Sequence, residues 1–361
     1  MAGAMCRRGL LLGAGLWLFA GVGACRVEFG APTQTLAACP DAVPSGRVVL
    51  YTSVYREVVD ALQELAHTEL PHVDVQVFQG GSEKVAARLD ADLAAGRAGA
   101  DVLLISDPLV YRRLKTAGEL LPYASAAATP IPRALVDYDN AFVGARVSTM
   151  VIAWNPLKTE SDTVPRTLGT ILSPAHARDL AFGDPLSSGT FFMTSLTVAA
   201  QAAPDSWPPP FTFLRTLREG GAAIGGGNGV VLDRLLRGER RFGVVLLENV
   251  LAAQARNEPI AWRIPDDGPV VVAGDVAILA DTKNPVAARA LVDLLLAPAG
   301  QRIIVDVGRM HAVDPRLPAP DAAPPLNGLL AARPLDEALL ARAAATRSDV
   351  TDAIQDALVG P

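Results

Sequence analysis

The feature that most restricts the fold is a regular alternation of short apolar runs and helical patterns, which begins at Arg47. The run VVLYT is typical of a buried strand, and after it Val58, Leu62 and Leu65 recur at helical spacing. VDVQVF and ADVLLI predict two further strands, again separated by a helical segment. Strands that alternate with helices favour a parallel sheet covered by helices, so the sequence predicts an α/β fold.

The second half of the chain repeats this alternation less regularly. STMVIAWNP and DLAFGD predict strands, an apolar helix is expected from Phe191 to Ala203, and FGVVLLEN predicts another buried strand. The chain has 361 residues, which exceeds one ordinary core, so we expect two lobes.

The N-terminus has the pattern of an export signal. Arg7 and Arg8 precede an apolar run from Gly9 to Ala24, which has about the length of a signal-peptide core. The run ends in VGAC, which resembles the lipobox of bacterial lipoproteins. We therefore expect residues 1–24 to be a signal peptide and Cys25 to be lipidated, so that the protein is exported and anchored at the cell envelope, in the periplasm or on an outer membrane face. The alternative is ordinary cleavage followed by a disulfide between Cys25 and Cys39.

Composition narrows the classes of partner. The net charge of −6 comes without any basic run of the kind that tracks a phosphate backbone, so we expect no nucleic-acid partner. No second apolar run is long enough to span a bilayer, so membrane attachment is expected through the lipid alone. Residues 25–46 have no helical or strand period and are rich in proline and small residues, as a linker would be.

Polar residues follow each predicted strand of the first half. In α/β sheets ligands gather outside the carboxyl ends of the strands, where helix N-termini also offer free N–H groups. The alternative is that Ser53, Ser82 and Asp107 only cap helices. The candidate ligand-binding residues here are Thr52, Ser53, Tyr55, Gly81, Ser82, Ser106 and Asp107.

Two further groups of candidates lie in the second half. The segment AFGDPLSSGT runs from a predicted strand into a helix, and FGVVLLEN ends in an acid and an amide. Each acid in these groups can also be an ordinary cap or surface residue. The candidates are Asp184, Ser187, Ser188, Gly189 and Thr190, followed by Glu248 and Asn249.

Four segments together carry a family resemblance: VVLYTSVYREVVDAL, GADVLLISDPLVYRRLKTAGELLPY, AFGDPLSSGT and AILADTKNPVAARALVDLLLAPAGQ. From about Arg47 to Ala312 the chain resembles the extracellular solute-binding proteins of ABC importers, in the branch that contains ferric-ion, phosphosugar and aminoethylphosphonate binders. The resemblance implies a two-lobed, type II-like periplasmic-binding-protein fold that closes on a small solute. It also implies delivery to an ABC permease and ATPase complex, with no catalysis and no cofactor.

The resemblance further implies that two strands cross between the lobes. The extended stretches available for this are NAFVGARVSTMVIAWNP and EPIAWRIPDDGPVVVAGDVAIL. We therefore expect lobe 1 to comprise residues 47–147 and 270–313, and lobe 2 residues 148–269. Residues 314–361 form a Pro-rich stretch followed by helices, whose role the sequence leaves open.

The nature of the solute is inferred from a departure from the ferric binders. Those relatives place two adjacent tyrosines after the strand that here reads FGVVLLEN, and phenolate oxygens suit ferric ion, whereas this chain has Glu248 and Asn249. We therefore expect a phosphorylated or phosphonate organic anion, held by hydroxyls and helix N-termini, with the acids binding sugar hydroxyls or an amine and with no metal ion. The alternative is ferric ion held by Tyr55, Asp107 and Glu248.

Two other classes of protein share part of this pattern. A lipid-anchored hydrolase is disfavoured because no Gly-x-Ser-x-Gly occurs and no histidines stand in H-E-x-x-H spacing. The histidines are instead expected at the surface: His67, His72, His176 and His311. A ligand-sensing lipoprotein that docks a receptor has the same residue chemistry as an importer component and stays open.

Overall fold

The computed structural model describes residues 43–333 and 335–360. The predicted signal peptide, the predicted lipid anchor Cys25, Cys39 and most of the predicted linker lie outside the described residues. Within the described ranges, no helix has the length and apolar character needed to cross a membrane.

The first lobe follows the predicted alternation of strands and helices. β1 pairs in parallel with both β2 and β3, and β1 begins at Gly46, one residue before the expected start of the fold. The apolar stripe predicted on the first helix is buried at Val58 and Leu62. The elements are β1 (Gly46–Thr52), α1 (Arg56–Glu69), β2 (Val73–Gln79), α2 (Ser82–Ala94), β3 (Val102–Ile105) and α3 (Pro108–Thr116).

Two long strands, β5 (Val143–Trp154) and β10 (Val270–Leu279), occupy the middle of the sheet. Every residue of both strands is buried, as expected for strands covered on both faces. They pair antiparallel with each other, and β10 also pairs with β3 while β5 pairs with β8 (Phe242–Leu246). The strand order β2-β1-β3-β10-β5-β8-β6-β7 thus joins the lobes through β5 and β10. The short strand β4 (Leu120–Leu121) also pairs with β10.

The second lobe alternates β6 and β8 with helices, and its short strand β9 pairs with β5. The apolar helix predicted from Phe191 begins two residues earlier, at Gly189, because Ser188 caps it. Glu248 and Asn249, expected after the strand, lie in the first turn of α8. The remaining elements are α4 (Leu168–Ile171), β6 (Leu180–Gly183), α5 (Gly189–Ala202), α6 (Thr212–Glu219), β7 (Ala223–Gly225), α7 (Asn228–Arg237), α8 (Leu247–Ala255) and β9 (Ala261–Arg263).

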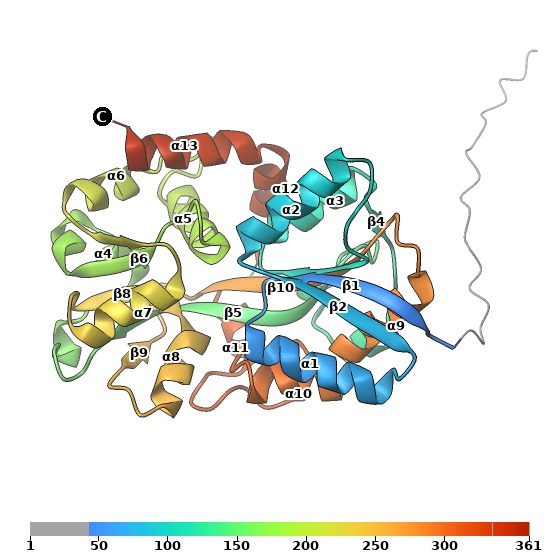
Figure 1. Ribbon diagram of the computed structural model, residues 1–361. Coiled ribbons are helices and arrows are strands. Elements are labelled where there is room, and N and C mark those ends of the chain that lie inside the picture. Colours follow the sequence, from blue (N-terminus) through green and yellow to red (C-terminus); the bar gives the residue numbers. More distant parts are fainter. Residues whose placement is uncertain (1–42, 334, 361) are drawn as a thin grey trace, which may run out of the picture. The chain divides into compact units, whose positions relative to one another are not determined.

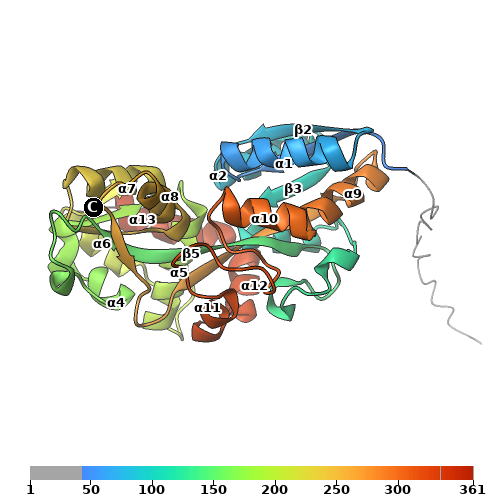
Figure 2. The same ribbon diagram turned by 90° about the horizontal axis from the view of Figure 1, so that it is seen from below.

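Helices cover both faces of each lobe, as Figures 1 and 2 show. In the first lobe, α1, α9 (Pro285–Leu296) and α10 (Pro298–Asp306) bury one face of the sheet, while α2 and α3 bury the other. In the second lobe, α5 and α6 bury one face, and α7 and α8 bury the other. The result is a two-lobed α/β fold, as expected.

The C-terminal helices contact both lobes. α12 (Glu337–Ala345) packs on α3 of the first lobe, and α13 (Arg347–Val359) packs on α6 of the second. In Figure 1 α13 extends across α5 and α6, while α12 lies near α3. Leu340, Val350 and Ile354 complete the apolar core of the second lobe. The segment is therefore part of the folded body, and α11 (Leu326–Ala332) packs against the core of the first lobe.

The expectation of surface histidines is wrong for His311. This side chain is buried, and its Nε2 lies 2.8 Å from the carbonyl oxygen of Pro324. The cause is the path of the chain after α10, which returns to the sheet and forms a bridge between His311 and Val147. Burial lowers the pKa of His311, so the ring is neutral near pH 7. His67 and His72 are exposed, as expected.

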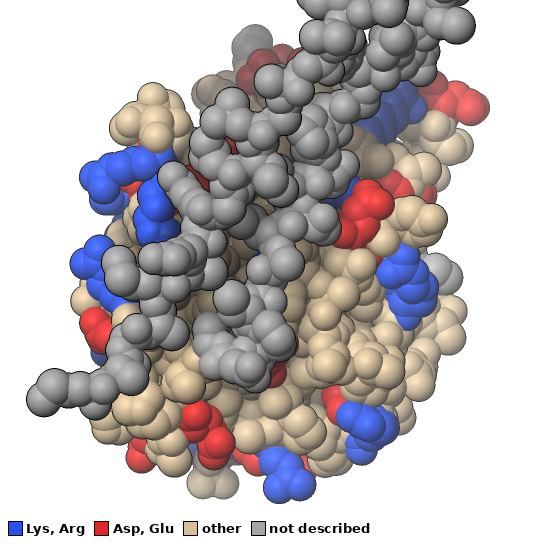
Figure 3. All heavy atoms as spheres, turned by 90° about the vertical axis from the view of Figure 1, so that its right-hand side faces the viewer, with Lys and Arg blue, Asp and Glu red and all other residues tan. Residues whose placement is uncertain are grey.

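Figure 3 shows one side of the molecule in space-filling form. On the part of this side that is in view, Lys and Arg side chains lie beside Asp and Glu side chains around the edge. This part of the surface therefore carries both signs of charge, and neither sign dominates it.

Candidate functional site

Thr52, the last residue of β1, and Ser53, which follows it, have different roles. Thr52 is buried and its hydroxyl is used by the backbone: Oγ1 donates to the carbonyl of Leu104 at 2.9 Å and accepts from the N–H of Val54 at 3.1 Å. Ser53 is only half-buried, and its Oγ accepts from the N–H of Ser106 at 3.2 Å. Thr52 thus builds the turn, while Ser53 links the ends of two neighbouring strands.

Ser53 belongs to a cluster around a buried arginine of β5. The Arg146 cluster, as we name it, consists of Ser53, Tyr55, Arg146, Ser148, Glu248 and Asn249. Arg146 is only 4% exposed. Its Nη1 donates to Ser148 Oγ at 3.0 Å and contacts the sulfur of Met310 at 3.2 Å, and its Nη2 lies 3.4 Å from Ser53 Oγ. Within the described residues its Nε has no hydrogen-bond partner.

The Arg146 cluster is built from both lobes. Ser148 Oγ donates to Glu248 Oε1 of α8 at 2.6 Å. The hydroxyl of Tyr55, just before α1, donates to Oδ1 of Asn249 on α8 at 3.1 Å. The N-terminal turns of α1 and α8 therefore lie close to each other across the lobes, and a helix N-terminus has N–H groups without an intrahelical partner. Four of the predicted ligand-binding residues converge here.

Burial dominates the electrostatics of this cluster. It raises the pKa of the Glu248 carboxyl, which the hydrogen bond from Ser148 and the charge of Arg146 oppose. It lowers the pKa of Arg146, which Glu248 opposes. Burial and the nearby Glu248 raise the pKa of the Tyr55 phenol, so this hydroxyl is neutral near pH 7. The cluster thus offers one guanidinium, one carboxyl and several neutral donors in a place with little water.

A second group, the Arg347 cluster, consists of Glu83, Asp107, Phe192 and Arg347. Asp107 caps α3 by accepting from the N–H of Leu109 at 3.0 Å, and its other oxygen lies 2.7 Å from Nη1 of Arg347. Nη2 of Arg347 lies 3.0 Å from Glu83 of α2, and the guanidinium lies 5.0 Å from the ring centre of Phe192 on α5. Asp107 therefore caps a helix, in agreement with the alternative interpretation, and also pairs with a cation of α13.

The remaining first-lobe candidates lie close to this second cluster. Gly81 is exposed and is the N-cap of α2, and Ser82 is the first residue of that helix. Across the lobes, a Cβ placed on Gly189 would lie 3.2 Å from the carbonyl oxygen of Ser106 and 3.6 Å from Cβ of Ser82. Glycine at position 189 is what allows the start of α5 to approach the ends of β3 and α2 so closely.

The Asp184 turn, residues 184–190, is held together by its own polar groups. Oδ1 of Asp184 accepts from the N–H of Leu186 at 2.9 Å, and Oδ2 lies 3.3 Å from the hydroxyl of Ser187. The hydroxyls of Ser188 and Thr190 lie 3.3 Å apart and both residues are buried. Nδ2 of Asn228, the first residue of α7, donates to Thr190 Oγ1 at 3.3 Å.

The sequence interpretation missed several polar residues of these groups: Arg146, Ser148, Asn228 and Arg347. A signal for Arg146 was present, because a charged residue within an apolar strand pattern is rarely buried unless other polar groups pair with it. Arg347 gave no local signal, since it lies 240 residues from Asp107 in the chain. Among the described residues, no group of three or more His, Cys, Asp and Glu side chains is arranged to hold a metal ion.

Comparisons with known proteins identify the family. The family model described as bacterial extracellular solute-binding protein matches residues 48–309. A comparison with curated protein sequences finds no match.

Solved structures with the same fold are numerous and distant in sequence. Iron-bound HitA from Pseudomonas aeruginosa is 19% identical with a TM-score of 0.74, covering 86% of this chain and 99% of its own. AfuA from Actinobacillus pleuropneumoniae, a periplasmic binding protein with fructose-6-phosphate bound, is also 19% identical, with a TM-score of 0.75 and coverages of 87% and 98%. The ferric binding protein from Campylobacter jejuni is 15% identical with a TM-score of 0.71, covering 86% of this chain and 99% of its own.

The family match covers well over half of the chain, and the structural neighbours share its two-lobed fold. The chain therefore belongs to the bacterial extracellular solute-binding proteins, the substrate-binding components of ABC importers.

Proposed function

We propose that this protein captures a small phosphorylated or phosphonate organic anion between its lobes and delivers it to an ABC permease. The observation that carries this proposal is the guanidinium of Arg146, which is buried between groups of both lobes and has an Nε without a partner among the described residues. A planar guanidinium is well suited to bidentate hydrogen bonding of phosphate oxygens.

The other members of the Arg146 cluster supplement this cation. Ser53, Ser148 and Tyr55 supply hydroxyls, and the first turns of α1 and α8 supply free N–H groups at the positive ends of helix dipoles. Micromolar binding needs about −8 kcal/mol, whereas one helix terminus contributes roughly 0.3 to 1 kcal/mol and one charge-assisted hydrogen bond about 1.5 to 3 kcal/mol. Several of these groups must therefore act together, which is why their convergence supports the proposal.

The carboxyl groups suit the non-phosphate part of such a ligand. Glu248 lies within the Arg146 cluster and could accept from a sugar hydroxyl or a ligand amine. Asp107 is engaged by Arg347, and Asp184 by its own turn, so they contribute less directly. A related fold, that of AfuA, has fructose-6-phosphate bound, which is the same class of ligand.

Ferric ion is the second candidate, because Tyr55 and Glu248 lie in one cluster and because HitA and the protein from C. jejuni are iron-binding relatives in fold. Two observations weigh against it. The third proposed ligand, Asp107, pairs with Arg347 in the other cluster, and the cation of Arg146 disfavours a second cation beside it.

The domain limits and the anchor complete the proposal. Lobe 1 would comprise residues 47–147 and 270–313 and lobe 2 residues 148–269, a division supported by the pairing of β5 and β10 with strands of both lobes. Lipidation at Cys25 would hold the protein at the cell envelope, next to its permease.

Calorimetric titration of the purified protein tests the ligand class. The ligands are fructose 6-phosphate, 2-aminoethylphosphonate, inorganic phosphate and ferric citrate. Arg146→Lys keeps the charge beside Glu248 but loses the planar fork, so it should weaken binding of a phosphorylated ligand at least about tenfold. Arg302→Lys, at an exposed position of α10, is the matched control and should bind like the wild type. Binding of ferric citrate alone would overturn the anion proposal.

A further inference from the structure

A cavity lies away from the Arg146 cluster, under the C-terminal helices. It has a volume of about 660 Å³ and is enclosed by α5, β10, the loop that precedes β5, and α12. Its walls are mostly apolar and include Leu135, Met193, Val272 and Leu340. Cavities of about 300 to 1,000 Å³ with apolar walls and a few polar groups are typical of small-molecule sites. No member of the Arg146 cluster lines this cavity.

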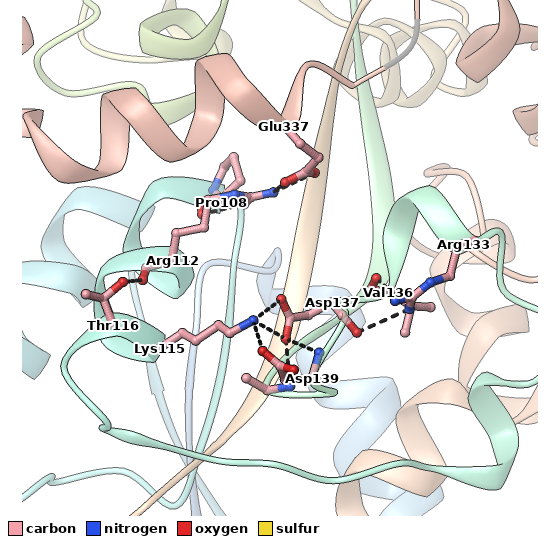
Figure 4. A network of polar contacts seen from close by, with 10 residues as sticks. Pro108, Arg112, Lys115, Thr116, Arg133, Val136, Asp137, Asp139 and Glu337 are labelled. Carbon is pink, nitrogen blue, oxygen red and sulfur yellow. Dashed lines mark hydrogen bonds and ion pairs between the residues drawn. The ribbon is translucent and has the colours of Figure 1, made fainter.

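The charged side chains around the rim are already paired, as Figure 4 shows. Arg112 of α3 lies 2.7 Å from Glu337 at the start of α12. Lys115 lies 2.8 Å from Asp137 and 2.7 Å from Asp139. The first of these pairs joins the first lobe to α12, and the other two hold the loop before β5 to α3.

The other charged residues that line the cavity bond to the backbone. Arg133 donates to the carbonyl groups of Val136 and Asp137 at 3.0 and 3.2 Å, Arg333 donates to the carbonyl of Asp267, and Asp336 accepts from the N–H of Leu339 at 2.9 Å. Nη1 of Arg333 has no hydrogen-bond partner among the described residues, although Nη2 bonds to the backbone.

Asp275 is the acidic residue of this cavity whose carboxyl group is unpaired in the part of the chain that the structure describes. Its side chain lines the cavity from β10, beside the bulge at Gly274, and the residue is only 3% exposed. Within the described residues its carboxyl group makes no hydrogen bond and no ion pair, whereas its backbone carbonyl accepts from the hydroxyl of Tyr111. Burial, the largest effect, raises the pKa of this carboxyl to about 7, although the charge of Arg112 opposes the rise.

We infer that this cavity binds a hydrophobic molecule that carries one protonated amine, with the ammonium group on the Asp275 carboxylate and the apolar body between α5 and α12. A buried carboxylate without a donor is costly, and an ammonium supplies both the opposite charge and the N–H donors that the surrounding protein does not. The volume of the cavity is far larger than a small ion needs and suits a body of drug-like size.

Three fluorescent compounds with the same apolar group test the inference: dansylcadaverine, which has an amine, dansylamide, which is uncharged, and dansylglycine, which has a carboxylate. The dansyl emission rises when the group leaves water, so each dissociation constant can be measured by titration into the full protein at pH 8. Dansylcadaverine should bind at least about tenfold more tightly than the other two, because a charge partner in a desolvated site is worth more than about 1.4 kcal/mol.

Two variants locate the site. Asp275→Asn should remove the advantage of dansylcadaverine over dansylamide, whereas Asp306→Asn, at an exposed position of α10, should leave it unchanged. Ala200→Trp fills the cavity from α5 and should reduce the binding of all three compounds.

Two outcomes would overturn the inference. One is equal binding of the three compounds to the wild type, which would mean that the cavity selects apolar bodies without regard to charge. The other is a preference for dansylcadaverine that survives both Asp275→Asn and Ala200→Trp, which would place the amine at another part of the surface.

Discussion

Asp275 and Arg146 lie almost opposite each other on the two central strands, and both bury a group that can be charged. Gly274 pairs directly with Arg146 in the strand register, and a Cβ at Gly274 would lie 2.7 Å from Arg146 Cγ. The glycine therefore makes room for the guanidinium, and after the bulge that follows it Asp275 lines the cavity under the C-terminal helices. The irregular position at Gly274 thus accommodates both Arg146 and Asp275.

The raised pKa of Asp275 has a consequence for stability against pH. An acid whose pKa is about 7 when folded and about 4 when unfolded holds its proton more tightly in the folded chain. Its contribution therefore favours folding at low pH and is lost as the pH rises from about 4 to 7. Urea unfolding of Asp275→Asn and the wild type should show the wild type losing on the order of 3 kcal/mol relative to the variant between about pH 4 and pH 8.

A constant difference between the two unfolding curves would contradict this expectation. The comparison between variant and wild type cancels the other titrating groups to first order, provided that the groups facing Asp275 keep their own states. Those groups are Asp107, Tyr111 and Arg112 of α3 and its cap, Asp137 of the loop, Arg146 of β5 and Glu337 of α12.

For single residues, the sequence predicts which side chains lie at strand ends better than it predicts which side chains contact each other. The rule that ligands lie at strand ends directs attention to Ser53, Tyr55 and Glu248, which the structure brings together. It gives no account of Arg146, which lies inside a strand, because pattern analysis treats strand interiors as packing. Whether these residues hold the solute stays a prediction.

Among the elements, α12 and α13 are those whose role the sequence left open and the structure makes clear. α12 pairs with α3 through Arg112 and Glu337, while Arg218 of α6 donates to the carbonyl groups of Leu358 and Gly360 at the end of α13. Arg347, between them, reaches Asp107 and Glu83. These helices thus connect the first lobe to the second at several points.

Replacement of Arg347 tests the strength of this connection. Arg347→Met removes the cation from Asp107, which is only 2% exposed, and removal of one partner of a buried pair costs about 3 to 5 kcal/mol. Because Asp107 retains its cap bond and Glu83 is partly exposed, we expect a loss near the lower end, about 3 kcal/mol, in urea unfolding.

The double variant Asp107→Asn, Arg347→Met should recover part of that loss, since no buried charge is then left without a partner. Arg302→Met, at an exposed site on α10, is the control and should change the free energy of unfolding by less than about 0.5 kcal/mol. If Arg347→Met unfolds at the same urea concentration as the control, the ion pairs do not hold α13 in place.

Element types were predictable and their packing partners were not. The alternation of apolar runs and helical stripes identified β1, α1, β2, α2 and β3 in order, because each is set by local periodicity. The sequence left the role of the helices after the Pro-rich stretch open, and Leu340, Val350 and Ile354 belong to the core of the second lobe. Contacts between segments so far apart in the chain have no local signature.

In the molecule as a whole, two of the places where described residues bring the lobes close together bear on binding. One is the hydrogen bond between Tyr55 and Asn249, and the other is the close approach of Gly189 to Ser106. Binding by lobe closure depends on contacts that exist only when the lobes are together. Both places are therefore expected to contribute to the affinity for the solute.

A larger side chain at Gly189 should hold the lobes apart. Even the Cβ of Gly189→Leu would lie 3.2 Å from the carbonyl oxygen of Ser106, and the rest of the side chain needs more room, so closure should be blocked while each lobe stays folded. We expect solute affinity, measured by calorimetry, to fall at least about tenfold, with a smaller effect on the thermal midpoint. Gly328→Leu is the matched control, because Gly328 also lies in a helix and has open space around it. Equal affinities in the two variants would remove this contact from the closing motion.

The strand order also governs when the molecule can be completed during its synthesis. β10 lies between β3 and β5 in the sheet, so the strands of the first lobe stay separated from β5 until residue 279 has been made. The core of the second lobe is completed still later, when Val350 and Ile354 have been made. Because β10 ends at residue 279 of 361, this protein lacks a finished sheet for most of its synthesis, which proceeds at about 5 to 20 residues per second. A secretion channel that threads extended polypeptide requires a chain that has not yet folded, and the late completion of this sheet provides one.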